Sequence, residues 1–333
     1  MPLRLSVLDQ SPIADGSTGG DALRNSVDLA RHCERLGYTR YWVAEHHATP
    51  MLACASPEVL ISAIGAATAS IRVGSGGVML PHYSPLKVAE NFSMLSGMYG
   101  DRIDLAIGRA PGSDPITAFA LQRDRRTAGP DDFPEQLAEL LAYVNDAMPL
   151  THRFARLAKL PGGAVRPDVW LLGSSPQSGA WAAELGLPYA FADFINPVGG
   201  TDIAARYRAT YVPSTQHPDP RVIAAVWALC ADTDEEANRL AASSRMAFTL
   251  FLQGRLIPVP PVETALRFVE EHALEIDALG RRRRWLVGSP ATVKRGIEQM
   301  AADYGAEEVM VVTITYDHGA RKRSYELLAN AFR

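Results

Sequence analysis

Eight short apolar segments recur along this 333-residue chain, and segments with a helical hydrophobic pattern separate them. Such alternation predicts parallel strands joined by right-handed helical crossovers. Eight units favour closure of the sheet into an α/β fold of the (β/α)8 TIM barrel type, with an open, flavodoxin-like sheet as the alternative. We expect the strands at residues 3–8, 40–44, 71–78, 103–108, 169–173, 189–192, 222–230 and 308–314.

The strand expected at residues 103–108 supports closure through its own pattern, IDLAIG. Successive side chains of a strand point to opposite faces. The branched side chains therefore share one face, which suits packing beneath helices. The aspartate, alanine and glycine share the other face, and small or polar residues of this kind fit a crowded barrel axis.

A single barrel domain over residues 1–333 accounts for the length, with extra loop segments at 111–134 and 258–284 that we expect near the barrel mouth. The second segment carries a short helical pattern ahead of the last strand. The net charge of −4 gives no basic surface for nucleic acid. Three scattered cysteines and the lack of a membrane-spanning apolar run lead us to expect a cytoplasmic protein with no membrane partner.

Two of the expected strand ends carry residues suited to phosphate. Arg109 directly follows the strand at 103–108, where a guanidinium can hold a phosphate through two parallel hydrogen bonds. The strand at 169–173 runs into Ser174-Ser175-Pro176-Gln177-Ser178, which predicts a helix that starts at the proline. The free N–H groups of such a helix attract a dianion, although a serine pair before a proline is also a common plain helix cap.

Glycines interrupt the strand at 71–78, in the order Gly74-Ser75-Gly76-Gly77. A dinucleotide-binding loop is excluded, because Val-Met-Leu-Pro follows where a helix should begin. The glycines instead suit a flat platform on which a planar ring could approach the backbone, or a tight bend in a barrel strand.

The strand at 40–44 ends in Glu45-His46-His47, which raises the question of a metal site. In a regular strand the two histidines point to opposite faces and cannot easily share one ion. We therefore expect no metal, and a metal-dependent hydrolase is the weakest of the alternatives. An imidazole at a strand end is also a candidate base near neutral pH, or an ordinary hydrogen-bonded residue.

The segments 42–47 and 71–112 resemble the bacterial luciferase-like monooxygenase family, in particular its flavin-dependent, luciferase-type oxidoreductase branch, and the likeness spans most of the chain. The resemblance implies an FMN-dependent monooxygenase that acts on a small organic substrate with O2 and with reduced FMN from a separate flavin reductase. It assigns His46 to catalysis and His47 to a structural role. The residues that it assigns to FMN are Gly76, Gly77, Gly108, Arg109, Ser174, Ser175 and Ser178.

The resemblance also implies a cis peptide bond between Gly76 and Gly77, and a homodimer that packs through the helices expected at 23–36 and 87–98. Deazaflavin-dependent hydride transfer and non-catalytic FMN binding remain open as alternative functions. The substrate also remains open, because His82-Tyr83 replaces the Asn-His pair common in the closest branch.

Overall fold

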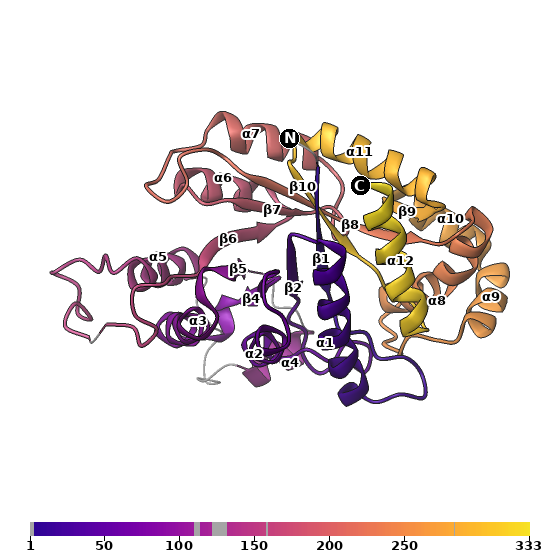
Figure 1. Cartoon of the computed structure of the whole chain (residues 1–333), viewed down its shortest axis with the longest axis horizontal. Helices are drawn as coiled ribbons and strands as arrows, with labels where there is room; N and C mark the ends of the chain where they lie inside the picture. Colours follow the sequence, from indigo (N-terminus) through magenta and orange to yellow (C-terminus); the bar gives the residue numbers. More distant parts are fainter. Residues whose placement is uncertain (1–2, 110–113, 122–131, 158, 283) are drawn as a thin grey trace.

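A closed barrel of eight parallel strands forms the centre of the molecule in the computed structural model, which describes residues 3–109, 114–121, 132–157, 159–282 and 284–333 (Figure 1). The barrel closes because β10 pairs with both β1 and β8. The predicted (β/α)8 barrel is therefore confirmed. In their order around the barrel, the strands are β1 (Arg4–Asp9), β2 (Arg40–Val43), β3 (Arg72–Ser75), β5 (Ile103–Gly108), β6 (Asp168–Gly173), β7 (Tyr189–Ala192), β8 (Val222–Cys230) and β10 (Glu308–Val312).

Two further strands differ from the prediction. The expected strand at 71–78 is divided, because the chain leaves β3 at the glycine pair and then forms the short β4 (Val78–Met79), which pairs with β5. Outside the barrel, β9 (Trp285–Gly288) pairs with the far end of β8. Strand β9 is absent from the strands that the sequence predicts.

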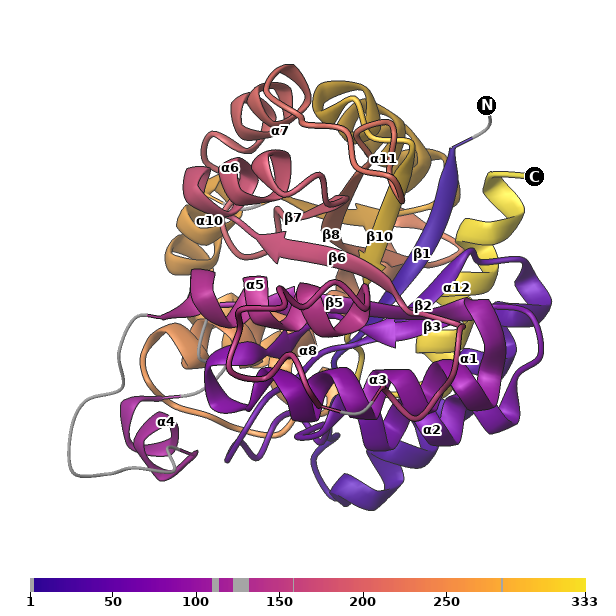
Figure 2. The same ribbon diagram turned by 90° about the vertical axis from the view of Figure 1, so that its left-hand side faces the viewer.

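Helices cover the outside of the barrel (Figures 1 and 2). Several begin at residues that favour helix starts: α1 has a Thr18–Asp21 capping box, and the Thr233 hydroxyl accepts from the Glu236 N–H in the first turn of α8. The covering helices are α1 (Gly19–Leu36), α2 (Pro57–Ala67), α3 (Pro85–Tyr99), α5 (Phe133–Val144), α6 (Pro176–Glu184), α7 (Gly200–Ala209), α11 (Pro290–Tyr304) and α12 (His318–Ala331), with the short 3₁₀ helices η1 (Leu80–His82) and η2 (Gly100–Arg102).

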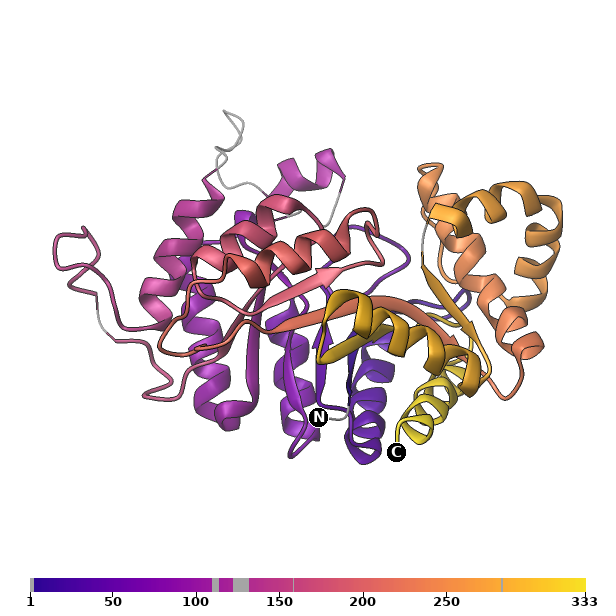
Figure 3. The same cartoon turned by 90° about the horizontal axis from the view of Figure 1, so that it is seen from above.

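The connection between β8 and β9 forms a helical group of its own: α8 (Asp234–Leu252), α9 (Val262–Glu271) and α10 (Ala273–Arg282). Figure 3 shows these orange helices gathered on one side of the barrel. The extra segment 258–284 is thus mostly helical rather than a loop. Its beginning lies near the barrel mouth, because Val259 exchanges backbone hydrogen bonds with the segment that follows β1. Of the other extra segment, 111–134, the described part includes α4 (Pro115–Leu121) and the start of α5, and residues 110–113 and 122–131 lie outside the described residues.

The core consists of two apolar layers, which the alternation in β5 separates. Ile103, Leu105 and Ile107 belong to the layer between the strands and the covering helices. Ala106 belongs to the layer inside the barrel, where Trp42 and Trp170 meet edge to face with ring centroids 5.5 Å apart. The two faces predicted for residues 103–108 are therefore confirmed. Within the described ranges, the structure contains no helix that is both long and apolar enough to span a membrane.

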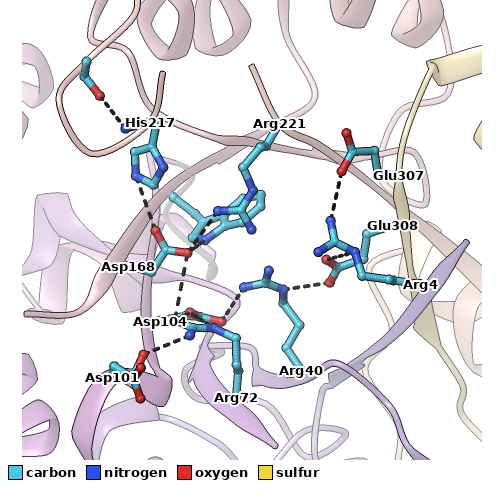
Figure 4. A network of polar contacts seen from close by, with 12 residues as sticks. Arg4, Arg40, Arg72, Asp101, Asp104, Asp168, His217, Arg221, Glu307 and Glu308 are labelled. Atoms are coloured by element: carbon cyan, nitrogen blue, oxygen red, sulfur yellow. Dashed lines mark hydrogen bonds and ion pairs between the residues drawn. The ribbon is translucent and has the colours of Figure 1, made fainter. Parts of the chain in front are cut away.

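Buried charges close the amino end of the barrel (Figure 4). Arg40 donates from Nη1 to Asp104 Oδ2 at 2.8 Å and from Nε to Glu308 Oε1 at 2.7 Å, and all three side chains are at most 2% exposed. Arg72 also donates to Asp104, at 2.5 Å and 2.9 Å. These residues are the first or second of their strands, so the network lies opposite the carboxyl ends, where barrel enzymes hold their active sites.

Candidate active site at the barrel mouth

The predicted site residues lie on neighbouring strands at the carboxyl end of the barrel. His46 follows β2, the glycine pair follows β3, Gly108 and Arg109 end β5, and the serines follow β6. Since β2, β3, β5 and β6 are consecutive around the barrel, these residues share one half of the mouth. These four groups of residues are distant from one another in the sequence. The order of the strands around the barrel brings them together.

The phosphate site predicted for Arg109 and the serines lies at α6. Arg109 is exposed, and its guanidinium carbon lies 5.6 Å from the centre of the Trp181 ring in α6, a cation–π contact. The serines lie at the start of the same helix. Arg109 therefore contacts the second turn of the helix whose first turn carries the serines, so a cation and the positive end of a helix dipole belong to the same α6 region of the mouth.

The three serines differ in their hydrogen bonds. Ser175 caps α6, since its hydroxyl accepts from the Ser178 N–H at 3.3 Å. Ser178 is buried; its hydroxyl donates to the Ser175 carbonyl at 2.8 Å and lies 2.9 Å from the Tyr189 hydroxyl. Ser174 is half-buried, immediately before the cap. Ser174 is therefore the serine best placed to reach a phosphate directly, whereas Ser178 would act through the cap.

The predicted ring platform has a Gly76–Gly77 peptide bond in the cis conformation. A Cβ atom added to Gly76 would overlap the Leu8 side chain, and one added to Gly77 would overlap that of Leu172. The Cβ atom at Gly77 would also lie 2.6 Å from the Ala106 carbonyl oxygen, which cannot move aside as a leucine side chain can, so packing inside the barrel demands a glycine most strictly at Gly77. The close packing explains the glycines as part of a tight bend in a barrel strand. A bend of this kind is compatible with a platform on which a planar ring rests.

Gly108 is different, because little of the described part of the chain lies beside it. A Cβ atom there would meet the Met79 sulfur at 3.4 Å, which is ordinary contact, and would fit. Packing among the described residues therefore does not demand a glycine at the mouth end of β5. A flat group that approaches this backbone from the barrel axis would use the room that the missing side chain leaves.

His46 lies between the ring platform and a large cavity. Its backbone N–H donates to the Cys54 carbonyl at 2.9 Å, which fixes the segment after β2. The ring is partly exposed and lines the cavity, and its Nδ1 is buried without a hydrogen bond in the described structure. Burial, and secondly the charge of His47, lower the pKa of His46 to about 4. The imidazole is therefore neutral near pH 7.

His47 belongs to a hydrogen-bond network around Glu45, which is fully buried. Glu45 accepts from His47 Nε2 at 2.7 Å, from the Tyr83 hydroxyl at 2.8 Å and from the Met79 N–H at 3.0 Å. These bonds join the end of β2 to the segment that follows the glycine pair. No local sequence motif marks Tyr83 or Met79 as a partner of Glu45. Among the described residues, no three metal-binding side chains lie together.

A cavity of about 560 Å³ occupies the other half of the mouth. It is bounded by the segments after β1, β2, β7 and β10, by β8 and β9, and by the second half of α8. Its volume lies in the range of small-molecule sites. The strand pattern does not predict this cavity, because it does not fix the positions of α8 and β9.

Comparisons with known proteins agree with this geometry. The family model described as Luciferase-like monooxygenase matches residues 3–308. The uncharacterized protein YwcH of Bacillus subtilis is 46% identical over 331 residues, which are 98% of each chain. N-acetyl-S-alkylcysteine monooxygenase of the same organism is 36% identical over 332 residues, covering 99% of this chain and 98% of its own.

Solved structures share the fold over nearly the whole length. Apo-MsnO8 superposes with a TM-score of 0.89 at 42% identity and covers 99% of this chain and 98% of its own. The oxygenating constituent of 3,6-diketocamphane monooxygenase from Pseudomonas putida, solved in complex with FMN, has the same fold with a TM-score of 0.73 at 20% identity, over 99% and 97% of the two chains. This chain therefore belongs to the luciferase-like monooxygenase family.

Proposed function

We propose that this protein is an FMN-dependent monooxygenase that uses O2, and reduced FMN from a separate flavin reductase, to oxygenate a small organic substrate. The observation that carries the proposal is the position of Arg109 beside α6, with its guanidinium carbon 5.6 Å from the Trp181 ring. A cation that packs on the helix whose free N–H groups face the mouth suits the phosphate dianion of FMN. The room beside Gly108 suits the flat ring of the same cofactor.

Each residue of the site has a separate task in this proposal. Arg109, Ser174 and the first N–H groups of α6 would hold the phosphate, and the backbone at Gly76, Gly77 and Gly108 would support the ring. Bound reduced FMN would supply the electrons that activate O2. Because His46 is neutral near pH 7, its Nε2 can accept a hydrogen bond at the cavity surface, but a pKa of about 4 makes the imidazole a weaker base than the one near neutral pH that the sequence predicts.

The proposal is tested by the binding of FMN and of riboflavin, which lacks the phosphate. Arg109→Ala should weaken FMN binding by about 1.5–3 kcal/mol, the range for hydrogen bonds to charged groups. Riboflavin binding should hardly change. Arg153→Ala is the matched control, because Arg153 is also exposed and stacks on an aromatic ring, with its guanidinium carbon 4.6 Å from the Phe154 centroid, away from the mouth.

Equal losses for FMN and riboflavin in Arg109→Ala would contradict the phosphate assignment. Tighter binding of a deazaflavin than of FMN would favour hydride transfer instead of oxygenation. With a flavin reductase and NADH present, O2 consumption that depends on an added organic substrate would distinguish a monooxygenase from a protein that only binds FMN.

A further inference from the structure

Aromatic rings from four different elements form one wall of the mouth cavity. Trp227 of β8 lies between Phe194, which follows β7, and Trp285 of β9, with ring centroids 5.9 Å and 6.4 Å away. Phe248 of α8 meets Trp285 at 5.9 Å. All four residues line the cavity, so a molecule that enters it meets a continuous aromatic surface, which we call the aromatic wall.

The two indoles of the aromatic wall present their hydrocarbon edges to the cavity. Both Trp227 and Trp285 are partly exposed, yet the Nε1 atom of each is buried and has no hydrogen-bond partner in the described structure. The exposed part of each side chain is therefore carbon. Leaving an N–H group unpaired costs stability, and the wall keeps these groups away from the space that a ligand would fill.

The charged residues that line the cavity also favour an uncharged ligand. Among the described residues that line the cavity there is no lysine or arginine, and the one carboxylate is that of Asp114. His46 is neutral near pH 7, since burial lowers its pKa to about 4. His47 also lines the cavity, but its Nε2 already bonds to the buried Glu45 at 2.7 Å. A carboxylate ligand would therefore lose its hydration without meeting a described cation that lacks a carboxylate partner, and that loss is unfavourable.

One uncharged polar group does reach the cavity. Gln10 follows β1, lines the cavity and is 7% exposed. Its side chain makes no hydrogen bond within the described part of the chain, and its polar atoms are not among those that are fully enclosed. The amide can therefore both donate to and accept from a neutral polar group of a ligand.

We propose that the substrate of this protein is an uncharged molecule whose apolar body packs on the aromatic wall and whose neutral polar group faces Gln10 and His46. Substrates that carry a free carboxylate are selected against. This inference rests on the proposed function, because the cavity adjoins the half of the mouth where FMN would bind. It goes beyond that function by naming the chemical class of the substrate.

A matched pair of probes isolates the charge: N-acetyl-S-benzylcysteine and its methyl ester. They share the apolar body and differ by one negative charge. Binding to the purified full chain, with and without FMN, is followed by calorimetry and by quenching of tryptophan fluorescence. We expect the ester to bind at least tenfold more tightly than the acid.

Two variants and one control variant test which residues make the protein prefer the ester over the acid. Phe248→Ala should weaken binding of the ester at least tenfold, whereas Phe154→Ala, a phenylalanine outside the cavity, should leave it unchanged. Gln10→Lys places a cation in the cavity and should bring the affinity of the acid up to or above that of the ester. Because Gln10→Lys gains a function, misfolding cannot imitate its expected result.

The inference is overturned if the acid binds as tightly as the ester, if Phe248→Ala behaves like Phe154→Ala, or if Gln10→Lys leaves the preference unchanged. Different measurements test the proposed function. If the protein prefers the ester but neither binds FMN nor consumes O2, the cavity selects uncharged ligands and the proposed function is wrong. If the protein binds FMN through Arg109 but prefers the acid, the proposed function stands and the inferred substrate class is wrong.

Discussion

Asp104→Asn tests how much the unfolding free energy depends on the paired buried charges at the amino end of the barrel. The Asp104 side chain is 0% exposed and accepts from Arg40 at 2.8 Å, from Arg72 at 2.5 Å and 2.9 Å, and from the Trp42 indole at 2.8 Å. Asparagine has nearly the same shape but lacks the negative charge. Its amide nitrogen would also point a donor at donors (Figure 4).

The size of the effect follows from the charges that remain. Arg40 is 2% exposed at its side chain, so it cannot recover hydration when its partner is neutralised. Breaking a buried ion pair by removing one partner typically costs about 3–5 kcal/mol. Glu308 still neutralises part of the Arg40 charge, at 2.7 Å, and therefore we expect a loss near the lower end, about 3 kcal/mol.

Urea denaturation measures this loss, with Asp146→Asn as the matched control. Asp146 also pairs with a cation, Lys159 at 2.9 Å, but its side chain is 55% exposed, and its φ of 53° is a conformation that asparagine tolerates. The control should unfold like the wild type. FMN affinity should be unchanged in both variants, because the network lies at the end opposite the mouth. If Asp104→Asn unfolded with the same midpoint as Asp146→Asn, the argument from buried charge would be refuted.

Three further predictions concern the mouth and the surface. His46→Ala should keep FMN affinity but lose most turnover, whereas His47→Ala should mainly lower the unfolding free energy, since His47 bonds to the buried Glu45 at 2.7 Å; normal turnover by the first variant would exclude the catalytic role. Because the pKa of His46 is lowered to about 4 from 6.5, the unfolded chain binds more protons between these values. The wild type should therefore lose unfolding free energy as the pH falls from 6.5 to 4, and His46→Gln should lose less, as measured by urea denaturation at several pH values. Light scattering should give a dimer that Met98→Glu dissociates, because α3 leaves Met98 55% exposed; a monomeric wild type would reject the dimer.

The barrel could be predicted from the sequence because each of its strands is buried between two layers. Apolar runs such as the one at 103–108 report that burial directly, and helix caps mark the connections between them. Strand β9 escaped prediction for a physical reason: it pairs with β8 alone, outside the barrel, and its first residues are only partly buried. A short edge strand of this kind lacks the continuous apolar run that marks a strand buried on both faces.

The candidate site was predictable where its residues form local motifs and unpredictable where they do not. Arg109, the glycine pair and the serines each stand at the end of an apolar strand, and a parallel barrel brings all strand ends to one rim. Tyr83, which bonds to Glu45, and Phe248 of the aromatic wall have no such marker. Their positions depend on how η1 and α8 pack, and hydrophobic periodicity does not determine that packing.

The two ends of the barrel differ in the side chains that their buried polar atoms belong to. At the amino end these atoms belong to charged groups: Arg40 donates to Asp104 at 2.8 Å and to Glu308 Oε1 at 2.7 Å, while Glu308 Oε2 is buried without a described hydrogen bond. At the mouth, His46 Nδ1 and the indole nitrogens of Trp227 and Trp285 are buried without described partners. Each such atom costs about 1–3 kcal/mol relative to a hydrogen-bonded one. A fold can tolerate that cost where the same side chains build a binding surface, because a polar partner supplied by the protein would occupy space next to the cavity. Paired buried charges at one end and an apolar, incompletely hydrogen-bonded mouth at the other are therefore compatible in one barrel.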